Sequence, residues 1–206
     1  IIASSTSGLS ISEIQRSAQY PERIVGGHPY EPTHLIPLIE VVKGKLTSDE
    51  AAECAYDFYR SLGKEPVMLN REVSGFIASR LLSAIYRECI DLVSNGVCSV
   101  EDIDKSFTYG PGVGLSVIGP NLNFHLRGQK FGGIKGFFTA YHDMISERMK
   151  EMANWTEEPE GWPELAEAGV VDEINNRSEF EGRTVEEITK YRDDMLIEIL
   201  KLHNKF

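Results

Sequence analysis

Three short apolar runs occupy the first part of this chain, and they limit its possible folds more than any other feature. The runs IIAS and RIVGGH end in small or polar residues, and PLIEVVKG contains a single acid, Glu40, among apolar neighbours. Runs of this kind are typical of the carboxyl ends of buried parallel strands. The sequence therefore predicts a sheet at the start of the chain, with strands at 1–4, 23–27 and 37–43.

Each of these three segments brings one chemically useful side chain: Ser7, His28 and Glu40. A carboxylate inside an apolar strand is costly to bury without a partner, and a histidine at the end of the neighbouring strand would supply one. Such a pair can act as a general base, in which the carboxylate orients the imidazole and stabilises its charged form. Ser7, at the tip of another strand, could hydrogen-bond a substrate oxygen.

The residues alone leave simpler interpretations open. Glu40 could be a half-exposed residue of an edge strand, and His28 could be a turn histidine before Pro29. Ser7 could simply belong to a tight turn, because the segment Ser-Thr-Ser-Gly favours such turns.

Several motifs stand in order along the chain: S-x-T-S-x-L-x-I, G-H-P-Y-x-P, L-I-P-L-I-E-V-V and SGFIASRLL. Together they resemble the 3-hydroxyacyl-CoA dehydrogenase family, and the resemblance covers nearly the whole chain. Within that family, YGPGVGLSVIGPNLNFHLRG and EGRTVEEITKYRDDMLIEIL are most similar to the carnitine dehydrogenase, gulonate dehydrogenase (lambda-crystallin) and diketoreductase branch. The resemblance implies an NAD-dependent oxidoreductase that interconverts a 3-hydroxyl and a ketone by hydride transfer.

The expected fold class is α/β plus all-α. Residues 1–72 are expected to form the second half of a Rossmann-type NAD-binding domain, with helices at 10–18 and from Asp49 to Gly63 and a last strand in EPVMLN. Residues 73–206 are expected to form an all-helical domain that covers the substrate and pairs subunits into a homodimer. No G-x-G-x-x-G turn follows a strand here, so we expect the first half of the cofactor domain to precede these residues in a longer polypeptide.

The second domain is expected to contain six helices. They are one long helix in SGFIASRLLSAIYRECIDLVSNG, then SVEDIDKSFTYG, LSVIGPNLNFHLRG, GIKGFFTAYHDMISERMKEMAN, a short PELAEAG helix and TVEEITKYRDDMLIEILKLHN.

The resemblance also assigns roles to individual residues. His28 is expected to take the hydroxyl proton, Glu40 to hold the imidazole ring, and Ser7 to orient the substrate next to the nicotinamide. Two positions depart from the family. Ser79 stands where an asparagine is common, and a hydroxyl would have to replace a carboxamide in binding the substrate oxygen. Glu31 stands where H-x-x-N-P has asparagine, and an acid near the nicotinamide would favour its positively charged oxidised form.

The substrate stays open between a hydroxyacyl-CoA and a small free hydroxy acid such as carnitine or gulonate. A third possibility is a crystallin-like structural protein that keeps the fold. Carnitine would require aromatic faces around its quaternary ammonium group. Candidates are Tyr30, Phe107, Tyr109, Phe124 and Phe131, although an aromatic residue in such a context is more often part of the core.

The composition limits the kinds of binding partner and the cellular location that are expected. The formal net charge of −11 argues against nucleic acid or an anionic membrane as a partner. Three cysteines, Cys54, Cys89 and Cys98, have no metal-ligand spacing and suggest a reduced, cytoplasmic protein without a metal. No apolar run approaches the length of a transmembrane helix.

Overall fold

The computed structural model describes residues 1–205, which form two compact units. The first, here called the sheet unit, contains Ile1–Ala84 and the end of the chain from Arg192. The second, here called the helical unit, contains Ile85–Tyr191. A Rossmann-like sheet with covering helices, followed by a helical region, confirms the predicted fold class.

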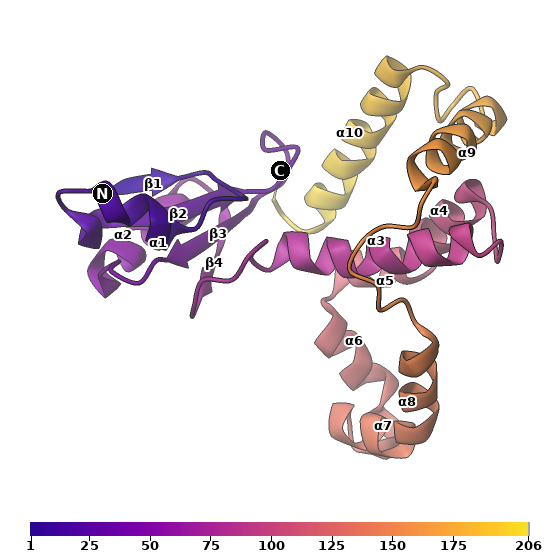
Figure 1. Cartoon of the computed structure of the whole chain (residues 1–206), viewed down its shortest axis with the longest axis horizontal. Coiled ribbons are helices and arrows are strands. Elements are labelled where there is room, and N and C mark those ends of the chain that lie inside the picture. Colours follow the sequence, from indigo (N-terminus) through magenta and orange to yellow (C-terminus); the bar gives the residue numbers. More distant parts are fainter. Residues whose placement is uncertain (206) are drawn as a thin grey trace. The chain divides into compact units, whose positions relative to one another are not determined.

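The sheet unit contains four strands that lie in their sequence order (Figure 1). β1 pairs with β2 in parallel, β2 pairs with β3 antiparallel, and β3 pairs with β4 in parallel. The carboxyl ends of β1 and β2 therefore lie at one edge, and β3 starts at that same edge. The bounds are Ile2–Ser4 for β1, Ile24–Pro29 for β2, Leu38–Lys43 for β3 and Glu65–Leu69 for β4.

Helices cover both faces of this sheet. Alternate residues of a strand point to opposite faces, and here both sets contain apolar side chains that need a cover. On one side Ile11 of α1 (Ile11–Ile14) packs in a cluster with Ile24, Val42, Leu69 and Phe76. On the other side Ala55 of α2 (Asp49–Ser61) packs with Val25, Ile39 and Val41. Tyr56 and Tyr59 border the second cluster. Two short 3₁₀ turns, Gln15–Ser17 and Pro21–Arg23, lead from α1 to β2.

A buried pair of polar side chains links the 3₁₀ turn after α1 and strand β2 to the turn before α2. Gln15 and Thr47 are both buried, and the Gln15 amide donates to the Thr47 hydroxyl over 2.9 Å. The Thr47 hydroxyl donates in turn to the carbonyl of Ile24 over 2.6 Å and accepts from the Gly44 amide over 2.9 Å. Each buried polar atom of the pair thus has a partner, as a stable interior requires.

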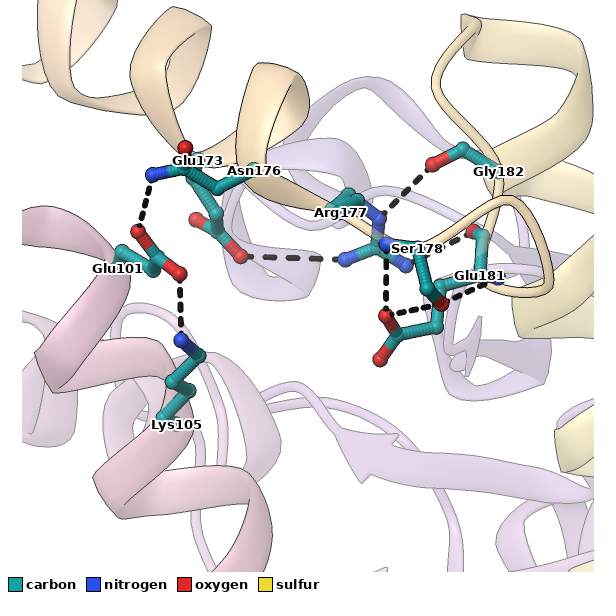
Figure 2. A network of polar contacts seen from close by, with 8 residues as sticks. All are labelled: Glu101, Lys105, Glu173, Asn176, Arg177, Ser178, Glu181 and Gly182. Atoms are coloured by element: carbon teal, nitrogen blue, oxygen red, sulfur yellow. Dashed lines mark hydrogen bonds and ion pairs between the residues drawn. The ribbon is translucent and has the colours of Figure 1, made fainter.

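The helical unit is built from short helices. In it, α4 lies against α9, and α6 lies against α7. Polar contacts join the α4–α9 pair to the loop after α9 (Figure 2): Asn176 donates to Glu101 over 2.7 Å, and Arg177 donates to the carbonyl of Gly182 over 3.1 Å. The helices are α3 (Ala78–Ser94), α4 (Val100–Tyr109), α5 (Pro111–Val117), α6 (Pro120–Arg127), a 3₁₀ turn (Gln129–Phe131), α7 (Ile134–Ala140), α8 (His142–Glu151), α9 (Trp162–Asn176) and α10 (Val185–Leu202). Of these, α3 and α10 contribute residues to both units.

Several predicted elements differ from the structure. Within residues 1–205, β1 pairs only with β2, and Ile2 in this strand is 66% exposed. The helix expected over 115–128 is split into α5 and α6, since Pro120 cannot continue a helix from the residues before it. The next expected helix is split into α7 and α8, and α9 is much longer than the PELAEAG segment.

Within the described residues, no helix combines the length and the apolar character needed to cross a bilayer.

Candidate active site

The centre of the candidate site is a buried histidine–carboxylate pair. His28 near the end of β2 and Glu40 in β3 lie directly opposite each other in the antiparallel register. His28 Nδ1 lies 2.8 Å from Glu40 Oε2, and the two residues are 7% and 0% exposed. An ionised carboxylate can only accept, so Nδ1 carries the proton and Nε2 keeps its lone pair. Within residues 1–205, Nε2 makes no hydrogen bond.

The second oxygen of Glu40 binds the start of a helix. Oε1 accepts from the backbone amides of Ile77 over 2.7 Å and Ala78 over 2.9 Å. These amides have no partner inside α3, and the positive end of the helix dipole favours a negative charge there. The buried carboxylate therefore has three donors, which offsets the cost of removing it from water. The interpretation of Glu40 as a half-exposed edge-strand residue is wrong.

Phe76 closes the pair from one side. Its ring meets the His28 ring edge to face, with centroids 5.3 Å apart and planes at 61°. The side chain is 3% exposed, and its backbone has a φ of +47°, which is uncommon for a residue other than glycine. Gly75 before it has a φ of +72°. This turn brings the amides of Ile77 and Ala78 to Glu40 and leaves the Phe76 ring against the imidazole.

The two glycines before His28 explain how helices can approach β2 from both faces. A Cβ on Gly26 would lie 2.9 Å from the Val42 Cβ and 3.2 Å from atoms of Ile11. A Cβ on Gly27 would lie 2.2 Å from the Tyr59 hydroxyl oxygen. The motif G-G-H thus lets α1 and α2 pack closely on the strand that carries the base. Burial also raises the pKa of the Tyr59 hydroxyl above its ordinary value.

Ser7 lies in the exposed loop between β1 and α1. Because Ser4 pairs with Gly26 in the parallel register, the loop after β1 leaves the sheet at the edge where β2 delivers His28. In open α/β sheets this edge, outside the carboxyl ends of the strands, is where ligands bind.

Comparisons with known proteins agree with this arrangement. A family model described as "3-hydroxyacyl-CoA dehydrogenase, NAD binding domain" matches residues 1–73, and one described as "3-hydroxyacyl-CoA dehydrogenase, C-terminal domain" matches residues 75–191. The chain belongs to the 3-hydroxyacyl-CoA dehydrogenase family. The predicted resemblance is thereby confirmed.

Among curated relatives, the chain is 39% identical over 202 residues to an L-carnitine dehydrogenase of Pseudomonas putida, covering 98% of this chain and 60% of the relative. It is 35% identical over 212 residues to an L-carnitine dehydrogenase of Bacillus cereus, covering 100% of this chain and 61% of the relative. The chain thus spans about 60% of the length of these relatives.

A solved structure described as a 5-formyl-3-hydroxy-2-methylpyridine 4-carboxylic acid 5-dehydrogenase, an NAD⁺-dependent dismutase, matches with a TM-score of 0.76 at 29% identity. The match covers 98% of this chain and 62% of that chain.

The two positions that depart from the family pattern lie in different surroundings. Ser79 is half-buried in the first turn of α3, one residue after the Ala78 amide that binds Glu40. Glu31 is exposed, and its carboxylate accepts from the amide of Thr33 over 3.3 Å. Glu31 therefore caps its own loop.

Three contributors to the site escaped prediction from sequence. The sequence predicts a helix that already includes Phe76 and Ile77, whereas α3 begins at Ala78. The Phe76 ring and the amides of Ile77 and Ala78 were therefore not expected at the site. Glu72, which binds the start of α1, gave no local signal because its partners are about 60 residues away. One signal in the sequence points to a distant cap for α3. No Ser, Thr, Asp or Asn directly precedes Ala78, so a carboxylate from elsewhere in the chain is needed to accept from its first amides.

In the helical unit, two aromatic candidates for a quaternary ammonium site already contact other rings or cations of the chain. In the helical unit, Phe124 packs against Phe137 and Phe138, with ring centroids 5.3 Å away in both pairs. The guanidinium of Arg127 lies 5.5 Å from the Phe124 centroid, and the ammonium of Lys130 lies 4.8 Å from that of Phe131. Cations of the chain itself thus contact these ring faces. Tyr109 is 69% exposed, and Tyr30 belongs to the sheet unit.

Proposed function

We propose that this protein is an NAD-dependent dehydrogenase that oxidises the secondary hydroxyl of a small hydroxy acid to a ketone, or catalyses the reverse reduction. The observation that supports this most strongly is the buried His28–Glu40 pair. Glu40 fixes the imidazole with Nδ1 protonated, and Nε2 is then the basic nitrogen. A base held in this way suits proton exchange with a substrate hydroxyl at neutral pH.

In the oxidative direction, Nε2 of His28 takes the hydroxyl proton as the C–H bond breaks. When bound, NAD supplies the acceptor for the hydride, so that the two electrons leave with hydrogen and the proton stays on the imidazole. Glu40 stabilises the imidazolium that forms. In the reductive direction, His28 returns the proton to the carbonyl oxygen. Ser7 and Ser79 are proposed to hydrogen-bond that oxygen.

The residues present fit the reacting end of NAD. The parallel pairing of β1 and β2 brings the Ser7 loop and His28 to one edge of the sheet, where nucleotide cofactors bind in folds of this class. We propose that Ser7 and Glu31 border the nicotinamide. The match of residues 1–73 to an NAD-binding family model supports the same cofactor.

Among substrates, we favour a small free hydroxy acid of the carnitine type. The two L-carnitine dehydrogenases that match nearly the whole chain support this choice. A 3-hydroxyacyl-CoA is the second candidate, because both family models are described by that activity.

The remaining proposals concern organisation. We propose that residues 1–72 serve catalysis and cofactor binding, and that residues 73–206 cover the substrate and pair two copies into a dimer. Large exposed apolar side chains in the helical unit, such as Leu126 at 54% and Met149 at 65%, support a contact surface.

We also propose that the protein works in the cytoplasm and does not attach to membranes, consistent with its three unpaired cysteines.

The test is a panel of substrates assayed by NADH absorbance on the purified full-length polypeptide. The panel contains carnitine, gulonate, free 3-hydroxybutyrate and 3-hydroxybutyryl-CoA, each assayed for the wild type and for His28→Ala. We expect turnover of carnitine or another free acid, reduced roughly 10²–10⁴-fold in the variant, as for the loss of a general base. Turnover of the thioester alone would select the second candidate. A protein that neither binds NAD nor turns over any member would be a structural relative, and the enzymatic proposal would fail.

A further inference from the structure

Glu72, in the segment between β4 and α3, holds the start of α1 from a distance of about 60 residues along the chain. Its Oε2 accepts from the Ser12 hydroxyl over 2.7 Å and from the Ser10 hydroxyl over 3.1 Å. Its carboxylate also accepts from the backbone amides of Ile11 and Ser12. A single half-buried side chain thus binds four donors at the point where the Ser7 loop ends.

The Ser7 loop has little else to hold it. Thr6 makes local bonds, accepting from the amides of Gly8 over 3.3 Å and Leu9 over 2.8 Å. Leu9 is 62% exposed, and a Cβ on Gly8 would contact nothing within 4 Å. No residue from Ser5 to Leu9 is buried. Among residues 1–205, the loop between Ser4 and Ile11 therefore has its long-range polar contact through Glu72, at its end.

The same segment also holds the base. Six residues after Glu72, the Ala78 amide donates to Glu40, next to the amide of Ile77. The Ser12 hydroxyl that donates to Glu72 also accepts from the amide of Lys45 over 2.9 Å, two residues after β3 ends. Residues 72–78 thus contact both the Ser7 loop and the carboxylate that orients His28.

We propose that Glu72 is a positioning residue that sets the place of Ser7 relative to the His28–Glu40 pair. The proposal rests on the function proposed above, in which Ser7 orients the substrate. Glu72 touches neither substrate nor cofactor, and it acts through the loop that it holds. Loss of its carboxylate would release α1 at its first turn and leave Ser7 mobile, while the His28–Glu40 hydrogen bond stays in place.

The experiment is a double-mutant cycle between Glu72→Ala and Ser7→Ala, with kcat and KM measured on the best substrate of the panel. Displacement of a catalytic group by about 1 Å can cost roughly 10²-fold, so we expect Glu72→Ala to lower kcat by about that factor. In the Ser7→Ala background the same change should cost less than about threefold, because the group that Glu72 positions is already absent. Glu72→Gln, which keeps an acceptor oxygen, should restore part of the rate.

A matched control is Glu13→Ala, which removes an acid of α1 itself. Within residues 1–205, the Glu13 side chain makes no hydrogen bond to the Ser7 loop. Its kcat should equal that of the wild type. If Glu72→Ala does not fold, Ser12→Ala removes the shortest reported hydroxyl contact of Glu72 and takes its place in the cycle. Losses that multiply independently of Ser7, or no loss at all, would overturn the proposal.

The proposal remains testable if the wild type turns over no substrate, an outcome that refutes the proposed function alone. Amide hydrogen exchange at residues 8–12 then reports on the loop directly. Faster exchange there in Glu72→Ala, with strand β2 unchanged and Glu13→Ala like the wild type, would support the positioning role. Unchanged exchange at these amides would refute it.

Discussion

The sheet unit and the helical unit treat polar groups in opposite ways. In the sheet unit, Gln15, His28, Glu40 and Thr47 are buried, and each has a hydrogen-bond partner in the interior. The helical unit, Ile85–Tyr191, buries apolar residues such as Ile90, Val93 and Phe137. Its polar network around Glu101, Glu173 and Arg177 is half-buried between α4, α9 and the loop after α9 (Figure 2).

This difference shows which unit can hold chemistry in a fixed geometry. A buried hydrogen-bonded carboxylate has one arrangement, because each alternative leaves a polar group without a partner. A surface ion pair exchanges readily with water and contributes little to stability. Residues in the sheet unit should therefore be sensitive to the loss of a single atom, and ion pairs in the helical unit should not.

The largest effect is expected for Glu40→Ala. The change leaves the amides of Ile77 and Ala78 and Nδ1 of His28 without their acceptor in a buried site. Breaking one side of a buried pair typically costs about 3–5 kcal/mol, so the free energy of unfolding should fall by that amount. Urea titration measures this loss, and activity should disappear with it.

Two controls sharpen this prediction. Glu40→Gln keeps the shape and one acceptor, and it should lose less stability than the alanine variant. In the helical unit, Glu147→Ala breaks an exposed pair with Lys150, whose atoms lie 2.6 Å apart. That change should alter stability by less than about 0.5 kcal/mol. Equal losses for Glu40→Ala and Glu147→Ala would contradict the contrast between the two units.

A smaller effect is expected for Thr47→Val, which keeps the volume of the side chain but removes its hydroxyl. The Ile24 carbonyl, the Gly44 amide and the Gln15 amide would each lose a buried partner. Leaving such groups unsatisfied costs about 1–3 kcal/mol. Thermal unfolding should show a lower midpoint for this variant, and Thr47→Ser should restore most of it. An unchanged midpoint for Thr47→Val would show that the pair is not a stabilising element.

Prediction from sequence succeeded where the signal was local. The apolar runs located β2, β3 and β4, and the predicted helices from Asp49 and in SVEDIDKSFTYG correspond to α2 and α4. The family motifs pointed to His28 and Glu40, which the antiparallel register places opposite each other. The catalytic roles of His28 and Glu40 remain predictions, as do the roles of Ser7, Ser79 and Glu31.

Prediction failed where partners are distant in the chain. The bonds from Glu72 to Ser10 and Ser12, and from Glu40 to Ile77 and Ala78, join residues 37 or more positions apart. The positive φ of Phe76 is a conformation that a phenylalanine rarely adopts, so residue identity gave no sign of it. Its helix was therefore expected to begin too early. Only the assembled sheet brings these groups together.

The smallest predicted effect concerns two acids of the helical unit, Asp104 and Glu173, and the pH dependence of stability that they cause. Although much of Asp104 faces solvent, its carboxyl is desolvated where α4 meets α9, and this raises its pKa. Burial, with the nearby charge of Asp104, also raises the pKa of Glu173. The folded state then binds more protons than the unfolded state above about pH 4, so this pair destabilises the fold as pH rises.

Asp104→Asn removes a desolvated carboxylate whose charge also raises the pKa of Glu173. It should be more stable than the wild type at pH 7 by less than about 1 kcal/mol, because both carboxyls are partly solvated. The difference should vanish near pH 4.

Glu101 provides the opposite control, since hydrogen bonds from Lys105 and Asn176 lower the pKa of its carboxyl. Its contribution is present at neutral pH and lost on acidification, so Glu101→Gln should be less stable than the wild type at pH 7 and match it in acid. Urea titrations of the three proteins from pH 4 to pH 7 would show the two variants diverging in opposite directions, and parallel curves would refute this assignment of charges.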